Sequence, residues 1–455
     1  MVKESELTEG SLPKKILLFS LPLMFSNILQ VLFNMSDIAV VGQFAGSGAL
    51  GSVGSTTILV SLLTGILIGM GSGVNVIVAR CIGTGHENDI SDSVHSALII
   101  CLASGVIVML GGVCFSRTLL EILGTKEDLI AGAQLYLRIY SLGMPALGIY
   151  NFGNAVYSAA GNTKKPLMFL FISGIINVIL NLFFVIVVRL DVAGVALASI
   201  ISQYLSAILV VVSLMRCKGA HRLSLKKLAV SGRWAKQIVG LGLPASLQNS
   251  IFAVANLFIQ AGVNSFDTIV VEGNSAAANA DTLVYDLMAA FYTACSSFMG
   301  QNLGAGKRDR VIKSYFLSLA YSFGAALVLG VFLVFAGDKF LMLFTKDPEV
   351  AAEGMERLKV MGFSYCVSAF MDCTIAASRG LGKSLIPTII VIMGSCVFRV
   401  IWVYTVFAYF HTLPSLYLLY VFSWTITAIA EITYFAHSWK KISSEIRTVA
   451  RAQTA

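Results

Sequence analysis

Charged or turn residues interrupt the chain at short intervals, and apolar runs long enough to cross a membrane lie between them. A membrane helix needs about 20 mainly apolar residues to span roughly 30 Å of hydrocarbon. Only 12% of the residues are charged, about half the share usual in soluble proteins, so a water-soluble fold is excluded. We therefore expect an all-α polytopic membrane protein. The runs predict twelve transmembrane helices, at approximately 16–42, 50–79, 93–115, 130–158, 166–188, 192–215, 236–262, 275–299, 313–335, 351–378, 386–409 and 414–437.

Lys and Arg are distributed unequally between the two sets of predicted loops. Cytoplasmic loops carry an excess of these residues near helix ends. If both termini are cytoplasmic, the basic residues of the outer segments are only Arg117, Lys126, Arg189, Lys339 and Lys346. We therefore expect a multi-pass protein of a prokaryotic plasma membrane with both termini inside. No nucleic-acid partner is indicated, because the basic residues do not gather on a soluble domain.

The two halves of the sequence resemble each other. At an offset of 221 residues, Gly83 lies over Gly304 and Gly161 over Gly382, each within a matching motif. Six helices per repeat is an even number, so both repeats enter the membrane from the same side, as in transporters built from parallel repeats. We expect two pseudo-symmetric six-helix bundles. The predicted parts are an N-lobe at 1–215, a cytoplasmic linker at 216–236, a C-lobe at 237–440 and a cytoplasmic tail at 441–455.

The source of energy follows by exclusion. The glycine-rich stretch 300–308 departs from the nucleotide-binding P-loop pattern, since Arg308 stands where Ser or Thr is required. Its glycines are better interpreted as a helix cap and a tight turn. No nucleophile or His/acid constellation suggests an enzyme, and no cysteine or histidine spacing suggests a metal site. Transport must therefore use an ion gradient or run downhill.

Asp37 is the acid whose burial most needs an explanation. It lies in an apolar stretch with no basic residue within a helical turn. A buried carboxyl group can hold a proton and release it when water or a cation arrives, which is the exchange that an antiporter needs. Asn177 and Asn181 share one face of the predicted helix 166–188, and Ser199 of the predicted helix 192–215 is expected near them. Their oxygen atoms can bind Na⁺ or accept a hydrogen bond from a protonated Asp37. The alternatives are a helix cap for Asp37 and ordinary helix packing for the amides.

The second half holds further polar and aromatic residues at helix depth. A polar stripe near Pro244 and an aromatic and Met-rich stretch in 275–299 suggest a substrate cavity, although plain core packing is an alternative. Ion pairing of Arg399 with Glu431 or Asp372 would satisfy these buried charges, and Asp281 is a further acid. The candidate cavity residues are Gln248, Asn249, Asn256, Tyr285, Asp286, Tyr292, Met299 and Arg399.

Small residues recur every four positions at Gly65, Gly69 and Gly73. Such a stripe lets two helices approach closely. We expect a packing role for it and no further function.

Several motifs together resemble one transporter family. They are Leu21-Pro22 followed by Asp37 and Val41-Gly42-Gln43, the stretch 300–307, Arg379-Gly380-Leu381-Gly382, and the duplication. The chain resembles the multidrug and toxic compound extrusion (MATE) family, in its DNA-damage-inducible-F-like branch. The resemblance implies two six-helix bundles around a V-shaped cavity and export of organic cations and other drugs coupled to inward H⁺ or Na⁺.

The family's site residues carry over onto this sequence with one departure. Asp37 matches the helix-1 acid, Asn177 the helix-5 Asn and Ser199 the helix-6 hydroxyl. Asn181 departs, because many relatives carry Asp there, and an amide cannot take up a proton. The helix-7 Glu of another branch is also missing, near Gln248, which favours coupling in the N-lobe.

We therefore predict a secondary antiporter that works by alternating access. It exports small amphiphilic or cationic substrates, needs no cofactor beyond H⁺ or Na⁺, and acts as a monomer in the bilayer. Pro22 and Pro244 are the predicted hinges. The alternatives are a flippase for a lipid-linked oligosaccharide or related amphiphile, and a passive channel.

Overall fold

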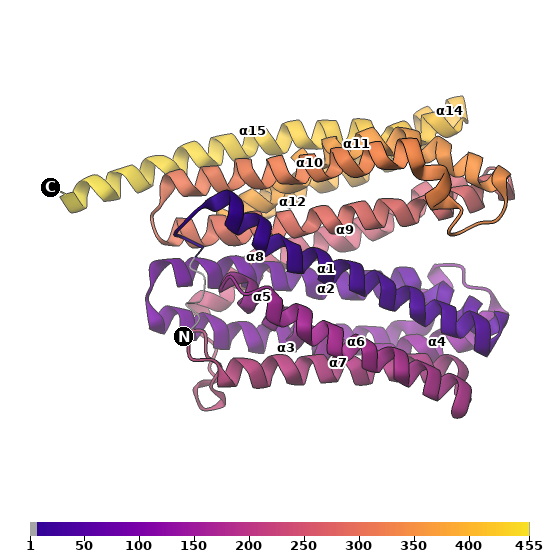
Figure 1. Ribbon diagram of the computed structural model, residues 1–455, viewed down its shortest axis with the longest axis horizontal. Coiled ribbons are helices and arrows are strands. Elements are labelled where there is room, and N and C mark those ends of the chain that lie inside the picture. The colour runs from indigo at the N-terminus through magenta and orange to yellow at the C-terminus, as the bar shows by residue number, and fades with distance from the viewer. Residues whose placement is uncertain (1–6, 455) are drawn as a thin grey trace. The chain divides into compact units, whose positions relative to one another are not determined.

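The computed structural model describes residues 7–454, and these contain helices and no strand (Figure 1). Each of the twelve predicted runs forms a helix or a stack of helical segments, so the predicted all-α membrane fold is confirmed. The first repeat comprises α1 (Leu12–Val40) with the π-helix η1 (Val41–Ala45), α2 (Ser47–Thr84), α3 (Glu87–Ile122), α4 (Glu127–Ser141), α5 (Met144–Ala159), α6 (Lys164–Leu182) with the π-helix η2 (Phe183–Val187), and α7 (Asp191–Arg216). After the short 3-10 helix η3 (Leu225–Lys227), the second repeat comprises α8 (Gly232–Val263), α9 (Thr268–Gly304), α10 (Arg308–Leu341), α11 (Pro348–Gly380), the stack α12 (Leu385–Val391), η4 (Ile392–Val397), α13 (Phe398–Trp402), η5 (Val403–Phe407) and α14 (Ala408–Phe410), and α15 (Leu413–Thr454).

Ten helices or stacks in the described part are long and apolar enough to cross a membrane. The predicted crossing at 130–158 is divided between α4 and α5, which have 15 and 16 residues. Pro145 explains the division, because proline lacks an N–H and is favoured in the first turn of a new helix. The crossing of α9 is long, but Asn274, Asp281 and Asp286 lower its apolar character.

Glycines at equivalent positions of the two repeats have the same backbone conformation. Gly85 and Gly306 have φ of 74° and 67°, and Gly161 and Gly382 have φ of 81° and 82°. These left-handed values favour glycine, which has no Cβ to clash. Each follows the end of a helix, as expected for caps and turns. The turn predicted for the stretch 300–308 is therefore confirmed.

The chain forms two compact units. Among the described residues, unit 1 holds residues 25–250, and unit 2 holds residues 7–24 together with residues 251–454. The division passes through α1 just after Pro22 and through α8 six residues after Pro244. Compared with the predicted lobes, the first parts of α1 and α8 are therefore exchanged. In unit 2, for example, the ring of Phe19 on α1 packs edge-on against Phe298 on α9, with centroids 5.5 Å apart.

Within unit 1, α8 packs against the stripe of small residues on α2. A Cβ added at Gly69 or Gly73 would overlap the backbone of α8. Asn249 also donates a hydrogen bond from Nδ2 to the carbonyl of Gly65 at 3.0 Å. The predicted close helix contact is confirmed.

In unit 2, the turn between α9 and α10 holds the segment that precedes α1. The N–H of Leu7 donates to Oε1 of Gln301 at 2.8 Å. Arg310 donates to the carbonyl of Gly10 at 2.9 Å and also to that of Leu7. Gln301 of the glycine-rich stretch and Arg310 of α10 therefore hold the segment just before α1.

Candidate functional site

Asp37 lies near the end of α1 and contacts α6 and α7 in unit 1. Asn181 on α6 donates from Nδ2 to Oδ1 of Asp37. Ser199 on α7 donates to Oδ2 of the same carboxylate at 3.4 Å. Asn181 Nδ2 also donates to Oδ1 of Asn177 at 3.2 Å, as the spacing of four residues on one helix face allows. The structure therefore brings the four predicted coupling residues together.

The site is enclosed by the bundle and rich in oxygen. Asn181 is fully buried, and Asn177 and Ser199 are also buried. The Oδ1 atom of Asn181 has no hydrogen-bond partner in the described part of the chain. A buried amide oxygen without a donor is an expected ligand for a cation or a proton donor. With the carboxylate of Asp37, this oxygen set fits either Na⁺ or a proton.

Two of the three helices that meet at the carboxylate, α1 and α6, change to π-helix next to the site. On α1, η1 starts four residues after Asp37, and on α6, η2 starts two residues after Asn181. Single turns of π-helix often occur at functional sites. Val41 of η1 and Val185 of η2 belong to one buried apolar cluster with Val195 of α7. The polar residues are therefore bounded by a closely packed apolar layer.

Two tyrosines of α4 belong to the surroundings of this site and were not predicted from the sequence. The rings of Tyr136 and Tyr140 stack with centroids 5.7 Å apart, and Tyr136 belongs to the buried cluster that contains Val40 and Val41, close to Asp37 along the chain. Their spacing of four residues placed them on one face of a helix, but nothing in that spacing showed which helix the face meets. The wall of the site near Asp37 is thus aromatic.

The predicted cavity residues do not share one type of environment. Gln248 is buried on α8, and Asn249 is used in the contact with α2. Asn256 is exposed on the part of α8 that belongs to unit 2. The amide of Asn249 therefore supports helix packing, the alternative that the sequence left open.

The aromatic and Met-rich part of α9 is divided between core and surface. Tyr285 is 51% exposed, and its ring lies 6.4 Å from that of Tyr292, which is buried. Asp286 is partly exposed. Met299 is fully buried in the apolar core of unit 2, where its sulfur accepts from Cys295 at 3.6 Å. Met299 therefore has a packing role in this structure, and Tyr285 is the accessible member of the set.

Arg399 is buried among aromatic rings of unit 2. Its guanidinium lies 4.7 Å from the ring centroid of Tyr420 and 5.7 Å from that of Trp424. Its Nε donates to Ser423 at 3.2 Å. No ion pair links it to Glu431 or Asp372 among the described residues, so the expected pairing does not occur there. Cation–π contacts offset part of the cost of burying this charge.

A different buried ion pair was missed in the sequence. Arg357 on α11 pairs with Asp281 on α9, and Tyr365 donates to the same carboxylate. Arg357 also donates to Oδ1 of Asn274. Arg357 lies well inside the predicted run 351–378, and that depth was the signal that could have identified it. Asp281 is therefore paired with a base, whereas Asp37 accepts its hydrogen bonds from an amide and a hydroxyl.

Comparison with known proteins comes from both sequence and structure. The MatE family model matches the chain twice, over residues 22–183 and 244–405, which agrees with the predicted duplication. The probable multidrug resistance protein YpnP of Bacillus subtilis is 28% identical over 366 residues, covering 80% of this chain and 81% of that protein. The FAD transporter of Shewanella oneidensis is 27% identical over 353 residues, covering 76% and 77%.

The fold is also similar to a solved structure, the outward-facing conformation of a multidrug resistance MATE family transporter of the MOP superfamily. The TM-score is 0.89 at 20% sequence identity, and the match covers 98% of this chain and 99% of the other. At that identity the match shows the fold alone.

Proposed function

The chain belongs to the MatE family of multidrug efflux transporters, and from this premise we propose that it is a secondary antiporter coupled through Asp37. It expels small amphiphilic or cationic molecules by alternating access in exchange for H⁺ or Na⁺. The observation that carries the proposal is the contact of Asp37 with Asn181 and Ser199 inside unit 1. No second acid takes part in these contacts, which supports a mechanism with one carboxylate.

The hydrogen bonds suggest how ion binding moves α1. A charged Asp37 accepts from α6 and α7, and hydrogen bonds to a charged group are roughly twice as strong as neutral ones. Protonation of Asp37 converts them to neutral bonds and makes one carboxyl oxygen a donor. Sodium would instead compete for the same oxygens. Protonation weakens the attachment of α1 to α6 and α7, whereas Na⁺ replaces its hydrogen bonds by ligation. Either event changes how α1 is held, so α1 can shift about Pro22, where the units divide.

The finer proposals follow from the same residues. Asp37, together with the absence of a glutamate near Gln248, supports the DNA-damage-inducible-F-like branch. The distribution of Lys and Arg supports cytoplasmic termini in a prokaryotic plasma membrane. We also propose that the transporter works as a monomer.

A flippase for lipid-linked sugars is not favoured. Such a protein needs several available cations for its phosphates, and the sequence offered Arg138, Lys359 and Arg399. In the structure Arg138 donates to Ser116, Lys359 pairs with Glu356, and Arg399 is surrounded by rings. Of the three, Arg399 is therefore enclosed, and the other two are single exposed cations on α4 and α11.

Efflux from proteoliposomes tests the proposal. A fluorescent organic cation is loaded, and pH and Na⁺ gradients are imposed separately, so the coupling ion is identified directly. Asp37→Asn should abolish gradient-driven efflux, because an amide cannot exchange a proton, whereas Asp191→Asn at the exposed start of α7 should not. Full efflux by the Asp37→Asn variant at equal reconstitution would refute the assignment.

A further inference from the structure

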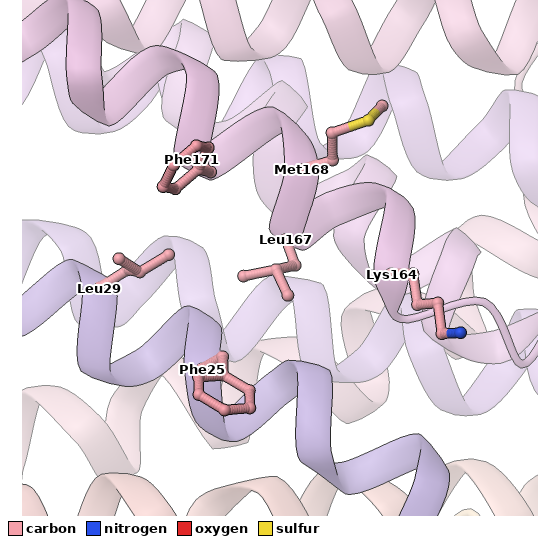
Figure 2. Close-up of a pocket in the computed structure, with 6 residues that line it drawn as sticks. All are labelled: Phe25, Leu29, Lys164, Leu167, Met168 and Phe171. Atoms are coloured by element: carbon pink, nitrogen blue, oxygen red, sulfur yellow. The ribbon is translucent and has the colours of Figure 1, made fainter.

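An apolar crevice of about 420 Å³ lies between α1 and α6 in unit 1. Figure 2 shows the side chains of α1 on one side, those of α6 on the other, and Lys164 toward one end. Phe25 and Phe171 are 58% and 49% exposed, so the crevice is open to the surroundings of the helices. The lining residues are Phe25, Leu29, Lys164, Leu167, Met168 and Phe171.

The opposite flank of α6 repeats this arrangement. A second crevice of about 320 Å³ is lined by Phe169 of α6 and Val212 of α7, with Lys165 and Arg216 at the same end of the helices. The ammonium group of Lys165 lies 4.9 Å from a tyrosine ring centroid. Lys164 is exposed and makes no ion pair within the part of the chain that the structure describes. Arg216 at the second crevice is also exposed, so both crevices end at basic side chains, and the crevice beside α1 is the one that borders the helix carrying Asp37.

The crevice marks the place where α1 and α6 separate. Farther along the two helices, Gly174 of α6 is packed so closely against the ring of Phe33 that a Cβ would overlap it. The bond from Asn181 to Asp37 lies about one turn beyond Phe33 on α1 and about two turns beyond Gly174 on α6. Whatever fills the crevice therefore lies between the two helices that form the coupling site.

We propose that this crevice binds an anionic phospholipid, with an acyl chain between α1 and α6 and the headgroup phosphate at Lys164. The proposal rests on the proposed orientation, which places Lys164 at the cytoplasmic leaflet, where anionic lipids concentrate. The open apolar walls suit a hydrocarbon chain, and the single basic side chain suits a phosphate and repels an organic cation. The bound chain fills the gap beside α1 and limits how far α1 moves when its carboxylate binds an ion.

Quenching by brominated lipids tests the site. Phe25→Trp places a reporter in the crevice, and the purified full-length protein is reconstituted in phosphatidylcholine with increasing brominated phosphatidylglycerol or brominated phosphatidylcholine. The signal of the native tryptophans is subtracted with the unmodified protein. We expect brominated phosphatidylglycerol to quench half of the reporter signal at a lipid fraction about fivefold lower than brominated phosphatidylcholine does. This factor corresponds to the attraction of one basic side chain to an anionic lipid. Lys164→Gln should abolish this preference, and Lys164→Arg should keep it.

The matched control is Leu102→Trp on α3, which is 39% exposed and lines neither crevice. There both lipids should quench equally. If Phe25→Trp behaves like this control, or if its preference survives in Lys164→Gln, the proposal is wrong. Phe171→Trp reports on the same crevice if Phe25→Trp fails to fold. The measurement needs no ion gradient, so its result is independent of whether Asp37 couples transport.

Discussion

Replacing Arg357 by leucine is expected to destabilise unit 2 by about 3–5 kcal/mol, the usual cost of leaving a buried charge without its partner. Arg357 is 6% exposed, and its Nε donates to Oδ2 of Asp281 at 3.0 Å. Its guanidinium also lies 5.4 Å from the ring centroids of Tyr417 and Tyr420. Without the guanidinium, only the hydroxyl of Tyr365 still bonds the carboxylate of Asp281.

The double replacement isolates the interaction. When Asp281 and Arg357 are both leucine, no buried charge remains at this position, and the stability should return to within about 1–2 kcal/mol of the unmodified protein. A surface pair on the same helix provides the control. Lys359 and Glu356 are 57% and 47% exposed, so Lys359→Ala should cost less than about 1 kcal/mol.

The free energy of unfolding can be measured by titrating the protein from mild-detergent micelles with sodium dodecyl sulfate while following tryptophan fluorescence. The double-mutant cycle then gives the coupling energy of the pair. The reasoning would be refuted if Arg357→Leu lost less than about 1 kcal/mol, or if the double variant were as unstable as the single one.

Three further outcomes are expected. Gly73→Ala should lower the free energy of unfolding by about 1–3 kcal/mol, because its Cβ would lie 2.7 Å from backbone atoms of α8. Gly111→Ala, whose Cβ would have nothing within 4 Å, should be neutral or slightly stabilising in the same titration. Asn181→Leu should slow ion-driven efflux by about 10-fold or more. Ser199→Ala should slow it by less than about 10-fold, because the hydrogen bond from Ser199 to Asp37 is long, at 3.4 Å. Equal losses in the two variants would contradict this order. Arg310→Ala should speed amide hydrogen exchange over residues 7–12 about threefold, measured by mass spectrometry, and unchanged exchange would show that the guanidinium does not hold this segment.

The sequence was sufficient to predict the helices and to single out the residues that meet at Asp37, because both depend on local patterns. Apolar length predicts a crossing wherever it occurs, and an isolated acid such as Asp37 stands out within such a run. The amides of Asn177 and Asn181 share a helix face by spacing alone. Their contact with Asp37 came from the resemblance to a family, since spacing does not show which faces meet.

The features that the sequence did not predict depend on which helices are neighbours. Arg357 finds its partner 76 residues earlier, on another helix, and no periodic pattern records that pairing. The exchange of the first parts of α1 and α8 between the units is equally invisible, because both helices look like ordinary apolar runs. Met299 shows the same limit, since a methionine at helical spacing suits a core and a cavity wall equally.

The duplication also explains why the acid site occurs once. At offsets of 221 residues, as in the motifs, and 222 residues, as between the two family-model matches, Asn181 corresponds to Trp402 or Val403 and Ser199 to Tyr420 or Val421. The backbone is repeated there, because the π-helix η2 after Asn181 has its counterpart in η5 after Trp402. The side chains are not repeated, and Tyr420 instead lies against the guanidinium of Arg399. An ion that needs carboxylate and amide oxygens would therefore find them at this position of the first repeat and not at its equivalent in the second. We expect coupling through this position to be asymmetric between the repeats.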